Sequence, residues 1–328
     1  MKNKKRSTIV GAALVIMGVL AGVRLGVFSL PDGWWQKGPL LRLPQGGMQR
    51  PTKTTMPPEP TVPAGPAKPV GLIFGAADVK KVSMQYGQDC NYRPDIAELL
   101  LQPLDWDLTI DEPTVLIIHT HATESYTESP GQNYVQTSEY RTLDTQYNMV
   151  KLGDALEKLL EEAGITVLHD RKLHDYPSYN SSYNNSRGSV EAYLQEYPSI
   201  RMVLDLHRDA VLDSDGSQYA PAVTVAGDQV ARLMLVVGSD GSGMNHPKWK
   251  ENLAAALKLQ VLLEQQAPGI TRPTFLRAQR FNHDLSNGAM IVEIGAAGNT
   301  LQEAMGAVPF LAQAIIDLRY GAITDSTS

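Results

Sequence analysis

Apolar residues along residues 113 to 323 follow two alternating patterns, one typical of strands and the other of helices. Continuous apolar runs, as in strands buried on both faces, lie at 115–118, 165–168, 202–206 and 290–294, with further strand candidates at 222–226 and 232–237. Helical spacing lies between them, at 144–163, 189–197, 249–266 and from Thr300 to about Arg319. This alternation predicts an α/β fold, with a largely parallel twisted sheet flanked by helices.

The first 70 residues have a different composition. Basic residues at positions 2, 4, 5 and 6 precede an apolar run, and segment 1–30 is long enough to cross a bilayer. We therefore expect a single-pass membrane anchor with the rest of the chain outside the cytoplasm, and a cleaved signal peptide is the alternative. The proline-rich residues 31–70 predict an extended stalk. Residues 71–112 are interpreted as an N-terminal extension of the α/β domain, and 324–328 as a polar tail.

Charge and cysteine content exclude several classes of function. The formal net charge is -6 and no basic patch with interleaved aromatic residues occurs, which disfavours nucleic-acid binding. The lone cysteine, Cys90, can form neither an intrachain disulfide nor a multi-cysteine zinc site. The chain also has no glycine-rich phosphate loop and no G-x-S-x-G motif, so nucleotide and serine hydrolase functions are disfavoured.

Histidine and glutamate gather where the predicted strands end. His119 and Glu124 follow the first strand, His207 follows the strand at 202–206, and Glu293 lies within the run 290–294. In open α/β sheets such positions meet at the carboxyl ends of the strands. A catalytic zinc ion takes about three imidazole or carboxylate ligands and leaves one position for water. We therefore predict a Zn²⁺ site of His119, Glu124 and His207, with Glu293 as the general base.

Two neighbouring residues qualify this prediction. If the first strand continues, His121 points to the same face as His119, so either could be the ligand, and His119 is preferred because it lies closer to the strand. By the same alternation Asp205 shares a face with His207 and could orient its imidazole. His169, His174 and His246 are interpreted as structural or solvated, and His283 as a possible substrate contact.

Three motifs in this order resemble the stage II sporulation protein P family. They are HTHATESY at 119–126, LHRDA at 206–210 and VEIG at 292–295, and the resemblance covers roughly residues 70 to 320. The family is similar in fold to the zinc-dependent N-acetylmuramoyl-L-alanine amidases, so the resemblance implies an amidase-like catalytic domain at 113–323. Those amidases take a glutamate ligand from the start of a helix, but Asp144 to Asn148 contain no glutamate. Glu124 is therefore our candidate for that ligand.

The resemblance implies a function in cell-wall remodelling. It implies a membrane-anchored peptidoglycan hydrolase that acts during engulfment in sporulation, with amidase activity and endopeptidase activity on cross-links. It also implies work beside stage II sporulation proteins D and M. The alternatives are a catalytically silent wall-binding scaffold and a zinc hydrolase of another extracellular amide.

Overall fold

The computed structural model describes residues 71–131 and 133–323. The predicted anchor at 1–30, the stalk at 31–70 and the tail at 324–328 lie outside these residues. Within the described part, no helix combines the length and the apolar character that crossing a membrane requires.

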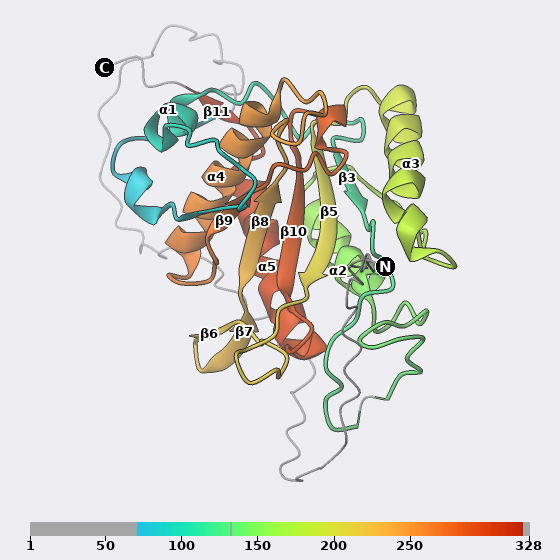
Figure 1. Cartoon of the computed structure of the whole chain (residues 1–328). Helices are drawn as coiled ribbons and strands as arrows, with labels where there is room; N and C mark the ends of the chain where they lie inside the picture. Colours follow the sequence, from blue (N-terminus) through green and yellow to red (C-terminus); the bar gives the residue numbers. More distant parts are fainter. Residues whose placement is uncertain (1–70, 132, 324–328) are drawn as a thin grey trace, which may run out of the picture. The chain divides into compact units, whose positions relative to one another are not determined.

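A seven-stranded sheet forms the centre of the described chain (Figure 1). Its strands, in spatial order, are β2 (Met84–Tyr86), β9 (Thr274–Leu276), β8 (Leu233–Val237), β10 (Ala289–Ala296), β5 (Met202–Asp209), β3 (Val115–Ile118) and β4 (Val167–His169). Neighbours pair in parallel except β10 and β8, which run antiparallel. The prediction of a largely parallel α/β sheet is thus confirmed.

The single reversal in the sheet follows from a connection without a helix. After β5 the chain forms an antiparallel hairpin of β6 (Ala222–Val225) and β7 (Asp228–Ala231) and then enters β8 directly. Two parallel strands must be joined by a crossover of a dozen or more residues, usually a helix. A strand that runs antiparallel to the one before it needs no such crossover. The sequence analysis predicted strands at 222–226 and 232–237 but did not predict β7, nor the short strands β2 and β9.

Helices cover both faces of the sheet. They are α1 (Ile96–Leu101), α2 (Met149–Glu162), α3 (Ser182–Glu196), α4 (Trp249–Gln266) and α5 (Leu301–Asp317), with short 3-10 helices η2 (Asp78–Lys81), η3 (Tyr179–Ser181) and η4 (His283–Leu285). The main core lies between the sheet and α2, α4 and α5. On the opposite face, α3 packs through Val190 against Leu116, Ile118 and Val203.

Local signals explain where the long helices begin and end. Thr300 and Glu303 form a capping box at the start of α5. Gly164, with a φ of 79°, follows the last turn of α2, where a glycine readily adopts the left-handed conformation that ends a helix. Residues 71–112 supply η2, α1, the edge strand β2, and β1 (Leu72–Ile73), which pairs in parallel with β11 (Ala322–Ile323). This segment is therefore interleaved with the rest of the domain.

Candidate metal centre

Strand alternation places the chemical residues on one face of the sheet. In β5, Met202, Leu204 and Leu206 belong to the main core, so Asp205 and His207 point to the other face. In β10, Met290, Val292 and Ile294 belong to the same core, and Glu293 also points away from it. Because Glu293 and His207 are register partners on adjacent parallel strands, their side chains are cross-strand neighbours.

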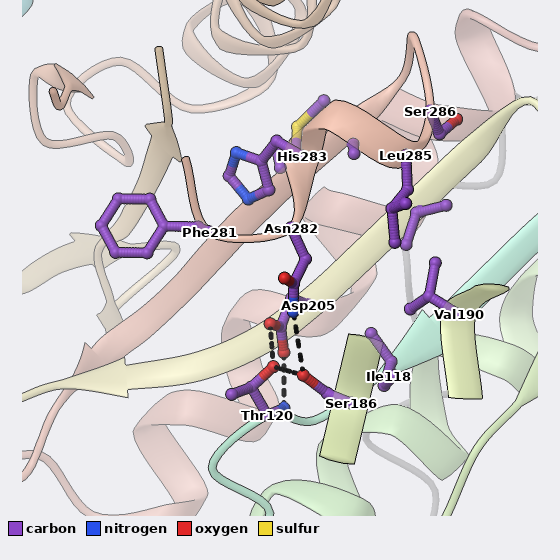
Figure 2. A pocket seen from close by; sticks show the side chains of 13 residues that line it. Ile118, Thr120, Ser186, Val190, Asp205, Phe281, Asn282, His283, Leu285 and Ser286 are labelled. Atoms are coloured by element: carbon purple, nitrogen blue, oxygen red, sulfur yellow. Dashed lines mark hydrogen bonds between the residues drawn. The ribbon is translucent and has the colours of Figure 1, made fainter. Parts of the chain in front are cut away.

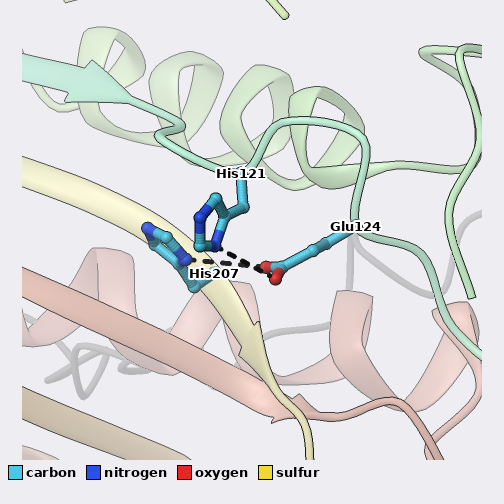
Figure 3. Close-up of side chains that lie close together, drawn as sticks. All are labelled: His121, Glu124 and His207. Carbon is cyan, nitrogen blue, oxygen red and sulfur yellow. Dashed lines mark ion pairs between the residues drawn. The ribbon is translucent and has the colours of Figure 1, made fainter. Parts of the chain in front are cut away.

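Three potential ligands converge at this place. The Nδ1 atom of His121 lies 3.4 Å from Oε1 of Glu124, and Nδ1 of His207 lies 3.5 Å from Oε2 of the same carboxylate (Figure 3). The potential ligand atoms of the three residues all lie within 4.8 Å of one another. We call His121, Glu124 and His207 the cluster.

Glu124 is fixed by two arginines. Its Oε2 accepts the backbone N–H of Arg208 at 3.2 Å, and its Oε1 accepts an Nη2–H of Arg141 at 3.1 Å. Burial by itself would raise the pKa of Glu124, but the Arg208 charge and the two cluster histidines outweigh it and hold the pKa well below its usual value. The carboxylate is therefore ionised, as a metal ligand must be.

Asp205 lies beside His207, where the sequence analysis expected an orienting residue. Its Oδ1 lies 2.9 Å from Nε2 of His207, and the two groups form an ion pair. Thr120 fixes the carboxylate in turn, through its backbone N–H at 2.7 Å and its hydroxyl at 2.5 Å. A proton on Nε2 directed at Asp205 leaves the lone pair of Nδ1 facing Glu124, the arrangement of carboxylate–histidine–zinc sites. Burial lowers the pKa of His207, but Asp205 and Glu124 raise it more, so it lies well above its usual value, and a metal ion would have to displace the proton on Nδ1 to bind there.

Aromatic rings hold His121 on its other sides. Tyr179 stacks on its ring with centroids 4.6 Å apart, and Tyr183 meets it edge-on at 5.6 Å. The guanidinium of Arg141 lies 4.8 Å from the Tyr179 ring. Tyr179 thus contacts both a cluster histidine and the arginine that holds Glu124.

The structure places His121 in the cluster and not His119, which the sequence analysis preferred. His119 is buried against α2, where its Nε2 lies 2.8 Å from Nε2 of His169 and its Nδ1 lies 3.3 Å from the carbonyl oxygen of Leu206. The strand ends at Ile118 and a turn follows, so the alternation that would give residues 119 and 121 the same face does not apply. The geometry therefore favours the alternative that the sequence analysis left open.

Glu293 lies beside the cluster without a hydrogen-bond partner. Its Oε2 is buried and meets no donor within the described residues. Burial, opposed by the charge of His207 and reinforced by Asp209, raises the pKa of Glu293 to about 8. The residue lies inside β10 rather than at its end. An unpaired buried carboxylate with a raised pKa is typical of a group that exchanges protons.

The remaining histidines have structural surroundings. Burial and the neighbouring His119 lower the pKa of His169 to about 2, and His174 pairs with Asp170. His246 is buried 3.4 Å from the Asn252 amide. His283 is also buried, and its Nδ1 accepts the backbone N–H of Gly238 at 3.0 Å. A direct substrate contact by His283, which the sequence analysis considered, does not fit this position.

A small pocket lies beneath Asp205 on the same face (Figure 2). Its volume of about 20 Å³ is near what one water molecule requires. The hydroxyls of Thr120 and Ser186 lie 2.8 Å apart there, and the Asn282 amide donates to Ser186 at 3.3 Å. The pocket is too small for a substrate, and its polar atoms support Asp205 from below.

The donor set of the cluster fits zinc. Two imidazoles and one carboxylate are the ligand types of catalytic zinc sites, and both Nδ1 atoms face the carboxylate. Arg141, Arg208 and Tyr179, which hold these ligands, were not predicted, because no spacing rule in the sequence links them to a carboxylate or ring that only the folded chain brings near.

The fold and the cluster together define a class, namely α/β proteins with a His–Glu–His cluster beside the carboxyl ends of parallel strands. The family model for Stage II sporulation protein P matches residues 73–316. The chain therefore belongs to the stage II sporulation protein P family.

Comparisons with individual proteins are consistent with this membership. The chain is 27% identical over 225 residues to Stage II sporulation protein P of Bacillus subtilis (strain 168), a match that covers 65% of this chain and 53% of that protein. It thus spans about half the length of this curated relative.

Two solved structures match part of the chain. The N-acetylmuramoyl-L-alanine amidase AmiC2 of Nostoc punctiforme matches with a TM-score of 0.39 and 12% identity, over 62% of this chain and 95% of that one. The apo amidase Ami1 of Mycobacterium abscessus matches with 0.38 and 15%, over 63% and 96%. At these TM-scores the likeness is partial and assigns no function.

Proposed function

We propose that this protein is a peptidoglycan hydrolase of sporulation, an N-acetylmuramoyl-L-alanine amidase that uses zinc. The observation that carries the proposal is the convergence of His121, Glu124 and His207 beside the unpaired carboxyl of Glu293. Family membership supports the link to sporulation.

The three cluster residues would hold the metal ion, and Glu293 would move the proton. When bound, zinc supplies Lewis acidity that polarises a carbonyl and lowers the pKa of water. A bound cation beside Glu293 would favour its ionised form, and its unpaired Oε2 would then take a proton from the attacking water and return it to the departing amine. Asp205 holds His207 in the tautomer that directs Nδ1 at Glu124, and Arg141 holds Glu124.

The setting of this activity is part of the same proposal. The basic and apolar composition of residues 1–30 supports a membrane anchor, with the catalytic domain outside the cytoplasm. Engulfment as the stage of action, endopeptidase activity, and stage II sporulation proteins D and M as partners are carried by the resemblance of the three motifs alone.

Zinc analysis of histidine variants, alongside digestion of purified peptidoglycan, tests the proposal. We expect His121→Gln and His207→Gln to lose both zinc and the release of stem peptides, because a three-ligand site tolerates no loss. His119→Gln is the matched control and should keep its zinc, since His119 lies against α2. Full zinc content in His121→Gln would refute the cluster as the metal site. Zinc-loaded protein that binds the wall and releases no peptide would indicate a silent scaffold.

A further inference from the structure

A buried aspartate, Asp175, lies near the cluster in the segment that follows β4. None of its side chain is exposed. Its Oδ1 accepts the backbone N–H of Thr123 at 3.2 Å, and its Oδ2 accepts the Thr123 hydroxyl at 2.5 Å. The same Oδ2 accepts an Nη1–H of Arg141 at 2.6 Å. Asp175 is therefore bonded both to the residue that precedes Glu124 and to the arginine that contacts the Glu124 carboxylate.

Arg141 divides its guanidinium between two carboxylates. Its Nη1 is held by Asp175, and its Nη2 donates to Oε1 of Glu124 at 3.1 Å. The other oxygen of Glu124, Oε2, accepts the backbone N–H of Arg208. Each Glu124 oxygen thus accepts one N–H, and because a carboxylate oxygen has two lone pairs, each retains one on the side of a cluster histidine.

This division matters because a guanidinium tends to pair with a carboxylate through two parallel N–H groups. If Asp175 did not hold Nη1, Arg141 could direct both of its Nη atoms at Glu124. The second N–H would then occupy a lone pair that a metal ion needs. The single contact seen between Arg141 and Glu124 is therefore the arrangement that leaves the carboxylate open to a metal ion.

We propose that Asp175 is a positioning residue of the metal centre, which holds Arg141 away from bidentate pairing with Glu124 and so keeps Glu124 available to zinc. The inference rests on the proposed function, because it takes the cluster to bind zinc. Asp175 forms no hydrogen bond with the cluster side chains and acts on them through Arg141. Loss of Asp175 should then be repaired by loss of Arg141, which a purely structural role of Asp175 does not predict.

Zinc affinity of the full-length protein, measured by competition with a chelator, tests this role without requiring turnover. Asp175→Asn keeps the size of the side chain and an oxygen for the Thr123 N–H, but it loses the charge that holds Nη1. We expect it to bind zinc about tenfold to a hundredfold more weakly than wild type. Arg141→Gln should bind zinc more tightly than Asp175→Asn. The double variant should match Arg141→Gln, because the competing guanidinium is absent from both.

Asp170→Asn is the matched control. Asp170 is a buried carboxylate of the same segment, and its Oδ2 lies 3.2 Å from Nε2 of His174 rather than beside Arg141. This variant should keep the zinc affinity of wild type, which separates the role of Asp175 from a general loosening of the segment. The visible absorption of the Co²⁺-loaded protein gives a second readout, because it depends on the geometry of the ligands. The spectrum should change in Asp175→Asn and should be the same in the double variant as in Arg141→Gln.

Two outcomes would overturn the proposal. One is a folded Asp175→Asn protein with the zinc affinity of wild type. The other is a double variant that binds zinc more weakly than Arg141→Gln, since Asp175 would then act independently of Arg141. This second comparison does not require Asp175→Asn to fold, because the double variant leaves neither charge of the buried pair without its partner. Wild type that binds no zinc would instead refute the proposed function, and the role of Asp175 with it.

Discussion

Replacement of Lys258 by methionine should stabilise the protein. Lys258 lies on α4 with 0% of its surface exposed, and its Nζ donates to the Leu99 carbonyl at 2.9 Å. The Phe74 ring lies 5.6 Å from Nζ, and no carboxylate of the described residues forms an ion pair with it. A buried charge without a counter-charge is costly, and methionine has similar length without the charge.

The magnitude follows from the pKa of the buried amine. Burial lowers the pKa of Lys258 from its usual 10.5 to about 8. That difference of about 2.5 in pKa corresponds to about 3 kcal/mol, which is the free-energy cost of keeping the ammonium group charged inside the folded protein at neutral pH. The variant loses one hydrogen bond, worth about 1 kcal/mol, but the Leu99 carbonyl still accepts the N–H of Gln102 at 3.3 Å. We therefore expect a net gain of about 2 kcal/mol at pH 7.

The pH dependence gives this prediction a second test. Between about pH 8 and pH 10.5 the unfolded chain holds a proton on Lys258 that the folded protein releases. The stability of wild type therefore rises with pH through this window. The advantage of Lys258→Met should be full below pH 8 and should disappear by about pH 10.

Urea unfolding at pH values from 7 to 10 measures both effects, as a shift of the midpoint at constant slope. Lys250→Met, an exposed lysine of the same helix, is the control and should show no comparable change. A Lys258→Met protein that is less stable than wild type at pH 7, or a difference that does not change with pH, would refute the reasoning.

Three further predictions concern the site and its support. Glu293→Gln should retain zinc while peptide release from peptidoglycan falls by about a hundredfold to ten-thousandfold, and near-normal release would make Glu293 a structural carboxylate. Asp205→Asn should weaken zinc affinity, measured by competition with a chelator, by about tenfold to a hundredfold, because His207 loses its orienting charge, and unchanged affinity would contradict that role. Gly153→Ala should destabilise the protein by about 1–3 kcal/mol in urea, because a Cβ there would lie 2.4 Å from Nε2 of His169 and 2.7 Å from Nε2 of His119. Gly188→Ala on α3 meets no atom within 4 Å and should be neutral or stabilising, and equal behaviour of the two variants would exclude the steric explanation.

The sequence predicts the elements that depend on local patterns. Helix α4 has the predicted bounds, Trp249–Gln266, because its apolar spacing ends at a Pro–Gly pair. The strands β2 and β9 have only three residues each and pair with partners far along the chain, so no local pattern reveals them. Short strands of this kind acquire their structure from tertiary pairing.

At the site, residues in strands were predicted more accurately than residues in turns. Asp205, His207 and Glu293 lie in strands, where alternation fixes the face of each side chain. His121 lies in a turn, and strand alternation cannot decide between it and His119. Arg141 approaches Glu124 from a loop 17 residues later, and only the folded chain shows this contact.

The antiparallel pairing of β8 with β10 has a consequence for how relatives of this protein could vary. Because β8 runs antiparallel to β5, the chain leaves the sheet after Asp209 and re-enters it at Leu233. Both points lie at the same end of the strands, the end next to His207. The intervening residues, with the β6–β7 hairpin, form an excursion that no sheet pairing constrains in length. This rim beside the cluster could lengthen or shorten without displacing any strand of the seven-stranded sheet. Related chains could therefore reshape the surface beside the cluster by altering this excursion, while the cluster stays fixed on its strands.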